Sequence, residues 1–94
     1  AGARAKLGIM KIRQFSLRRY VERALQLAEY LRDEDGVVVA RVPNADGFYA
    51  QGGSVEEARS ELAEVGEGNV LLALQLGLDV PELPDFSFIE QDVA

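Results

Sequence analysis

Apolar residues recur at helical spacing in the first third of the chain, after a serine that can cap a helix. From Ser16 onward they step by three and four positions, and this pattern alone would carry a helix as far as Arg32. The Asp-Gly pair in "DEDG", residues 33–36, is a hairpin signal, and a hairpin needs a strand before its turn. We therefore predict a short helix over residues 16–25 and a strand over residues 26–33.

The next apolar run, "VVVARV" at residues 37–42, is rich in β-branched residues and indicates a second strand. It must end at Pro43, because proline has no N–H group to donate to a neighbouring strand. After a polar turn, "FYAQG" at residues 48–52 indicates a short third strand. Residues 26–52 are therefore predicted to form a three-stranded antiparallel meander.

A long helix is predicted from Ser54 to Gly77. Ser54 and Glu57 match a capping box, and Gly77 suits the left-handed residue that often follows a helix. Gly66 and Gly68 lie inside this helix, where each is about 1 kcal/mol less favourable than alanine. The face that we expect to meet the meander consists of Val55, Ala58, Leu62, Val65, Asn69, Leu72 and Leu76.

Beyond Gly68 the helix is apolar on nearly all sides, and one three-stranded sheet cannot cover all of them. Either the C-terminal tail or another subunit must cover the second face. The tail alternates like a strand in "FSFIE", residues 86–90, which we expect to add to the sheet edge of a neighbouring subunit. The chain is thus predicted to form a homodimer or higher oligomer, with an interface that includes Val70, Leu71, Leu74, Leu78, Phe86 and Phe88.

Together these elements predict an α+β fold: a short N-terminal helix, a three-stranded antiparallel meander, a long helix and a C-terminal strand. The 94 residues suffice for one small domain, which we place at residues 16–94, with residues 1–15 as a leader or flexible N-terminus. No apolar run reaches the roughly 18 residues of a membrane span, and no secretory signal is visible. We therefore expect a cytoplasmic protein.

The net charge of −6 is unevenly distributed. Residues 1–32 carry eight Arg and Lys residues against two acids, a balance of +6, whereas residues 33–94 carry fourteen acids against two arginines, a balance of −12. An acidic body repels phosphate backbones, so we expect no direct binding of nucleic acid, and it suits a basic protein partner. An ordinary solvated surface would explain the same charges.

The chain contains neither cysteine nor histidine, which removes the thiolate nucleophile, the commonest general base and the commonest metal ligand. Four weaker signals have plain structural explanations. They are a glycine pair before a helix without the lysine of a phosphate-binding loop, turn acids without calcium-loop spacing, paired acids at a helix start, and a basic helix face. We predict no catalytic residue, cofactor or metal site among these groups, which are Gly52 and Gly53; Asp33, Glu34, Asp35 and Asp46; Glu56 and Glu57; and Arg18, Arg19 and Arg23.

The ordered motifs "EDGVVVARVPNADGFYAQGGSVEEA" and, after a long helix, "GLDVPELP" resemble the HicB-like antitoxin family. The resemblance covers residues 28–84. It places the family's structural motif at Ala40, Pro43, Gly47, Gly52, Ser54, Glu56, Glu57, Ala58, Gly77 and Pro81.

This resemblance implies a β-β-β-α-β unit of truncated ribonuclease-H-like fold that is not an enzyme. It also implies a partner, a small basic HicA-type mRNA-cleaving toxin, which such a domain binds and covers. Many family members carry a DNA-binding module after this unit, but only ten residues follow Pro84 here, so we expect no such module. The alternatives are a stand-alone protein- or ligand-interaction module of the same fold, and a hydrolase that uses carboxylates and a metal.

Overall fold

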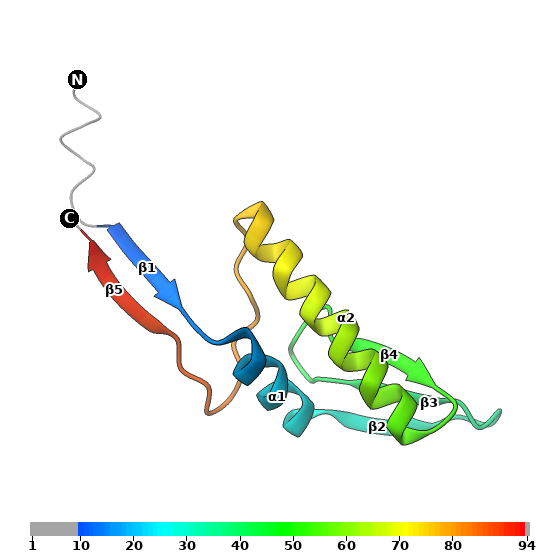
Figure 1. Ribbon diagram of the computed structural model, residues 1–94. Helices are drawn as coiled ribbons and strands as arrows, with labels where there is room; N and C mark the ends of the chain where they lie inside the picture. The colour runs from blue at the N-terminus through cyan, green and yellow to red at the C-terminus, as the bar shows by residue number, and fades with distance from the viewer. Residues whose placement is uncertain (1–9, 94) are drawn as a thin grey trace.

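A three-stranded antiparallel sheet with a long helix across one face forms the body of the protein, and a two-stranded ribbon extends from it (Figure 1). This computed structural model describes residues 10–93. The α+β fold class predicted from the sequence is confirmed. The elements are β1 (Met10–Gln14), α1 (Leu17–Leu27), β2 (Glu29–Arg32), β3 (Val38–Arg41), β4 (Tyr49–Gly52), α2 (Val55–Leu76) and β5 (Ile89–Val93).

The predicted meander is confirmed, with the strands in the order β2-β3-β4. At the hairpin turn the Asp33 carboxylate accepts hydrogen bonds from the backbone N–H groups of Asp35 and Val37, both at 2.9 Å. Gly36 follows with a φ of +83°. The side chain of Asp33 thus closes the turn, as short acidic side chains often do. Helix α1 begins after Ser16 as predicted, but it runs two residues past Leu25, so β2 is shorter than expected.

The loop between β3 and β4 contains two consecutive tight turns. The N–H of Ala45 bonds to the carbonyl of Val42, and the N–H of Phe48 bonds to the carbonyl of Ala45. Asn44 and Gly47 take the third position of the two turns with φ values of 62° and 90°, which favours glycine or asparagine there. The loop ends by directing Phe48 into the core, where its side chain is almost fully buried.

Helix α2 begins and ends as the sequence predicts. The hydroxyl of Ser54 accepts from the N–H of Glu57, and the Glu57 carboxylate accepts from the N–H of Gly53 at 2.7 Å. At the other end Gly77 adopts a left-handed conformation, and the N–H of Leu78 reaches back to the carbonyl of Ala73. The N–H of Gly77 bonds to the carbonyl of Leu74, and these two bonds form a Schellman motif, which satisfies carbonyl groups that the helix leaves unpaired.

The buried face of α2 differs from the one expected. Val55, Val65, Leu72 and Leu76 are exposed, although the three-and-four spacing placed them against the sheet. The stripe that packs on β3 and β4 steps by four residues each time and includes a glycine. A side chain at Gly66 would overlap the ring of Phe48, with its Cβ only 2.1 Å from a ring carbon. The buried residues of α2 are Ala58, Leu62, Gly66 and Val70.

The C-terminal strand lies at residues 89–93, later than the predicted 86–90, and it pairs with β1 of the same chain. The register sets Gln14 opposite Ile89 and Met10 opposite Val93. Residues 10–14 therefore belong to the fold, which corrects our expectation of a leader over residues 1–15, and residues 1–9 lie outside the described chain. The local sequence could not reveal this pairing, because the partner strand lies at the far end of the chain.

Between ribbon and body, Phe86 and Phe88 pack against Phe15 and Tyr20 of their own chain. The ring centroids of Phe15 and Phe88 are 5.1 Å apart and those of Tyr20 and Phe86 are 5.2 Å apart, both nearly perpendicular. Such edge-to-face pairs stabilise a core beyond the area that they bury. The hydroxyl of Tyr20 donates a hydrogen bond to the carbonyl of Pro81. The tail is thereby attached to α1 within one chain.

The buried hydroxyl of Tyr20 gives a pH-dependent test of this attachment. Burial raises the pKa of Tyr20 to about 12, because the phenolate loses its hydration. Because the folded-state pKa lies above the unfolded value of about 10, the unfolded chain loses the Tyr20 proton at a lower pH than the folded protein does. The stabilisation by the buried neutral hydroxyl is therefore complete below pH 10 and is lost as the pH rises towards 12. Tyr20→Phe should therefore lose about 3 kcal/mol less stability than the wild type over that interval, measured by urea unfolding. Parallel pH profiles for the two proteins would contradict a buried Tyr20.

Candidate functional site

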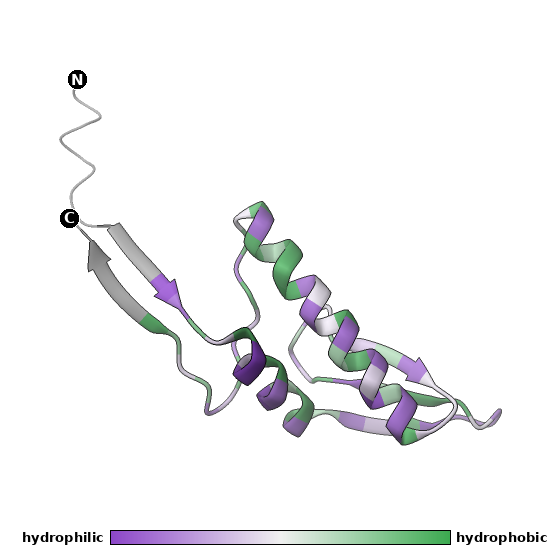
Figure 2. Cartoon of the chain, viewed as in Figure 1, coloured by the Kyte–Doolittle hydropathy of each residue, from purple (hydrophilic) through white to green (hydrophobic). Residues whose placement is uncertain are grey.

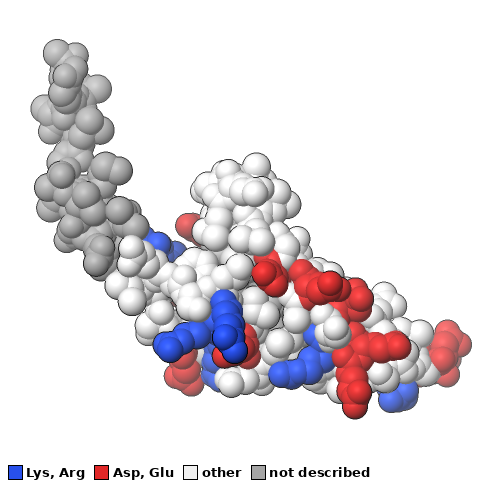
Figure 3. All heavy atoms as spheres, in the orientation of Figure 1, with Lys and Arg blue, Asp and Glu red and all other residues white. Residues whose placement is uncertain are grey.

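Charge and hydropathy divide α2 into two surfaces. The N-terminal half carries an acidic segment of exposed glutamates, whereas no charged residue occurs from Gly68 to Gly77. Figure 3 shows acidic side chains over the first half of α2 and basic ones over α1, and Figure 2 shows the apolar C-terminal half of α2. The acidic segment consists of Glu56, Glu61, Glu64 and Glu67.

The apolar half of α2 exposes a leucine patch. Leu71, Leu74 and Leu78 are 44%, 50% and 60% exposed, and Leu72 and Leu76, which we had assigned to the sheet face, are exposed as well. Exposed apolar groups concentrated at one helix end are typical of a protein–protein contact. Of the predicted interface residues, Val70 is buried in its own chain, and Phe86 and Phe88 pack on the chain's own aromatic rings. The leucine patch consists of Leu71, Leu72, Leu74, Leu76 and Leu78.

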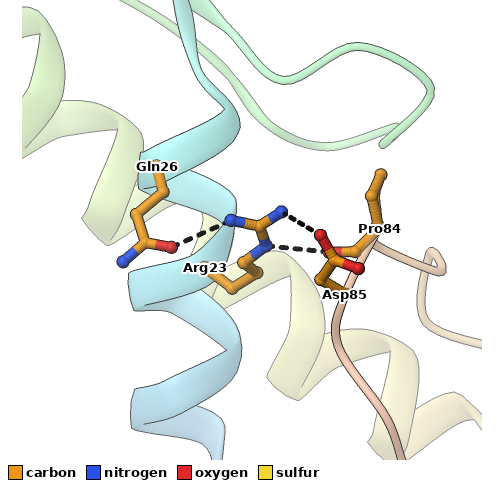
Figure 4. A network of polar contacts seen from close by, with 4 residues as sticks. All are labelled: Arg23, Gln26, Pro84 and Asp85. Carbon is orange, nitrogen blue, oxygen red and sulfur yellow. Dashed lines mark hydrogen bonds and ion pairs between the residues drawn. The ribbon is translucent and has the colours of Figure 1, made fainter.

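The basic face of α1 is partly occupied by contacts within the chain. Arg23 donates to the carbonyl of Pro84 at 2.8 Å and to the side chain of Gln26 at 3.0 Å, and it pairs with Asp85 at 3.4 Å (Figure 4). Arg18 pairs with Glu22 one turn away. The contacts of Arg23 hold the tail against α1, so this arginine has a structural role. On this face, Arg18 and Arg23 are therefore both paired with acids of the same chain.

The other chemical candidates also have structural roles. The N–H of Gly53 is bonded to the Glu57 carboxylate, so this amide does not present a free donor to a phosphate. A side chain at Gly52 would place its Cβ 2.5 Å from the backbone nitrogen of Ala58, which explains a glycine where β4 meets α2. Within residues 10–93, no three acidic side chains lie close enough together to hold a metal ion. Neither described helix is both long and apolar enough to cross a membrane.

The predicted motif residues occupy turns, caps and close contacts. Ala40 and Ala58 are fully buried between the sheet and α2, and Pro81 receives the hydrogen bond from Tyr20. Glu56 is exposed in the acidic segment. The remaining motif positions form the loop, the strand–helix junction and the two caps of α2 described above; they are Pro43, Gly47, Gly52, Ser54, Glu57 and Gly77.

A cavity of about 350 Å³ opens between the β3–β4 loop, the second half of α2 and the segment after that helix. Asn69 forms one wall, where its Nδ2 donates to the carbonyl of Gly47 at 2.7 Å and fixes the loop to the helix. Sequence reasoning missed this cavity because its walls come from three separate segments. Its lining consists of Asn44, Asp46, Phe48, Asn69, Val70, Ala73, Asp79, Val80 and Pro81.

Comparison with known proteins places these features in a family. The comparison with curated proteins gives no match. The fold is similar to the crystal structure of TTHA0281 from Thermus thermophilus, with 30% sequence identity and a TM-score of 0.67 over 73% of this chain and 86% of that one. Residues 19–81, from α1 to the carbonyl that accepts from Tyr20, match the UPF0150-like family. Since this match covers most of the chain, the protein belongs to the UPF0150-like family.

Proposed function

We propose that the protein is a HicB-like antitoxin, which acts in the cytoplasm by binding and covering a small basic HicA-type mRNA-cleaving toxin. The observation that carries this proposal is the exposed acidic segment of α2 on a UPF0150-like fold. An acidic surface attracts a basic protein and repels the toxin's RNA substrate, so it favours capture of the toxin over binding of nucleic acid. The protein contributes no catalytic group and acts by occlusion alone.

The proposal includes self-association through the leucine patch. The end of α2 that carries the patch projects beyond the sheet (Figure 1), where a second copy can pack its own helix against it. Burying one leucine contributes roughly 1.5–3 kcal/mol, so several on each side can offset the loss of freedom on association. A twofold arrangement would join two leucine patches and leave both acidic segments open to partners.

The antitoxin proposal predicts a salt-dependent encounter with any small basic protein that is encoded beside this chain, here called the basic neighbour. Its association rate should fall by about tenfold or more between low and physiological ionic strength, because exposed charges steer the approach. Stopped-flow mixing measures that rate, and an mRNA-cleavage assay shows whether one equivalent of the chain stops the toxin. Failure to form a complex with any basic neighbour would overturn the antitoxin role and leave a stand-alone interaction module.

A pair of matched variants locates the attracting surface. Glu61→Lys with Glu64→Lys reverses two exposed charges in the acidic segment, while Glu34→Lys with Asp35→Lys makes the same change at the exposed tip of the β2–β3 hairpin. The α2 variant should slow association more than the hairpin variant, because local potential at the docking site dominates steering. Equal effects would show that net charge, and not the acidic segment, attracts the partner.

A further inference from the structure

We propose that the cavity between the β3–β4 loop and α2 is a socket for an arginine side chain of the basic partner. This inference rests on the proposed function only in assigning the arginine to that partner. The wall residues carry both kinds of group that arginine requires: acids and amides to accept its N–H groups, and apolar side chains to cover its aliphatic stem. They combine Asp46, Asp79, Asn44 and Asn69 with Phe48, Val70, Ala73 and Val80.

The two carboxylates of this cavity are unpaired. Within residues 10–93, neither Asp46 nor Asp79 takes part in an ion pair or a side-chain hydrogen bond. At two other hollows of the surface, an acid is already paired with a cation of the same chain. Glu82 pairs with Arg13 beside a second hollow, and Glu22 pairs with Arg18 beside a third. The Asp46–Asp79 cavity therefore combines a concave surface with two carboxylates that form no ion pair within the described residues.

The hydrogen bonding of Asn69 favours a ligand that only donates. Because its Nδ2 is committed to the carbonyl of Gly47, its Oδ1 remains available as an acceptor. Together with the two carboxylates, this gives at least three side chains whose free groups accept hydrogen bonds. A guanidinium group offers five N–H donors in a fixed plane, whereas a lysine ammonium is a compact point charge that gains less from spread acceptors. The acceptor set therefore suits arginine better than lysine.

The cavity is large enough to admit one side chain from outside. Its volume of about 350 Å³ lies at the lower end of the range for small-molecule sites. Phe48 and Val70 belong to the core and are nearly fully buried, so the inner wall is rigid. Both aspartates are exposed at the surface, where an incoming cation can reach them without passing through the core.

The test uses two capped peptides, Ac-Gly-Arg-Gly-NH₂ and its neutral citrulline analogue, titrated into the isotope-labelled protein and followed by amide NMR. The arginine peptide should shift the resonances of Gly47, Asp79 and the Asn69 side chain in a saturable way, and the citrulline peptide should not. Asp46→Asn with Asp79→Asn should weaken that binding by about tenfold or more, since charge-assisted hydrogen bonds are lost without a change of shape. The control, Glu34→Gln with Asp35→Asn, removes the same charge from the exposed tip of the β2–β3 hairpin and should leave the titration unchanged.

Equal shifts from both peptides, or an unchanged affinity in the aspartate variant, would overturn the socket. A second measurement separates this inference from the proposed function: the Asp46→Asn, Asp79→Asn variant is mixed with the basic neighbour in place of the peptide. Faster dissociation of that complex, by about tenfold or more, supports the partner's arginine as the occupant. An unchanged complex overturns that assignment and leaves the antitoxin role standing, whereas peptide binding without any complex rejects the antitoxin role and leaves the socket.

Discussion

Gly66→Ala is expected to lower the free energy of unfolding by about 3 kcal/mol, at the upper end of the usual range for an overpacked core. The added Cβ would lie 2.1 Å from one Phe48 ring carbon and 2.5 Å from the next, and Phe48 is too buried to move aside freely. For a domain of this size, such a loss corresponds to a fall in Tm of roughly 12–24 °C. Thermal unfolding followed by circular dichroism measures the shift.

Gly68→Ala, two residues further along α2, is the matched control. A Cβ there meets nothing within 4 Å, so only the helix propensity changes, and stability should rise by about 0.5–1 kcal/mol. Combining Gly66→Ala with Phe48→Leu should recover part of the loss, because the smaller side chain makes room for the methyl group. If Gly66→Ala and Gly68→Ala shift Tm in the same direction, the ring of Phe48 does not lie against Gly66.

Leu71→Glu combined with Leu74→Glu is expected to convert the proposed dimer into a folded monomer. Both side chains are about half exposed within one chain, so the charges should disturb the fold little while placing four glutamates in a twofold interface. Loss of two buried leucines on each side should raise the dimer dissociation constant by about 100-fold or more. Sedimentation equilibrium at micromolar concentration gives the mass, expected for the wild type at twice the 10.3 kDa of one chain.

Val55→Glu combined with Val65→Glu adds the same charge to the acidic half of the same helix and should remain dimeric. Both valines are exposed and lie outside the leucine patch. A wild-type mass of 10.3 kDa at concentrations of tens of micromolar would reject self-association. The leucine patch would then be assigned to binding a different protein. Binding of the basic neighbour to the leucine variant and to the valine variant would test that assignment.

Local signals in the sequence predicted the parts of the fold that depend on a few adjacent residues. The Asp-Gly turn overrode a helical pattern that ran through residue 32, and the hairpin is present because Asp33 satisfies the turn's N–H groups itself. The caps at Ser54 and Gly77 were found for the same reason, since each depends on residues within one helical turn.

The buried face of α2 was misassigned because hydrophobic spacing treats glycine as a gap. Gly66 is instead buried, and the ring of Phe48 fills the space that a side chain there would take, so only knowledge of Phe48 could reveal its role. The candidate site was hidden for a related reason. Asp46, Asn69 and Asp79 belong to three segments whose meeting depends on the tertiary fold, and each looks like an ordinary surface residue in the sequence.

The ribbon of β1 and β5 has a consequence for the order in which the chain folds. It pairs Gln14 with Ile89, 75 positions apart, whereas the β2–β3 hairpin and the β4–α2 junction join near neighbours. Distant contacts form slowly, because a long loop must close before they contribute any stability. The meander and α2 should therefore assemble first and the ribbon last. In the native protein the same ribbon would open before the core does, as a separate cooperative unit whose release also frees the tail from Tyr20.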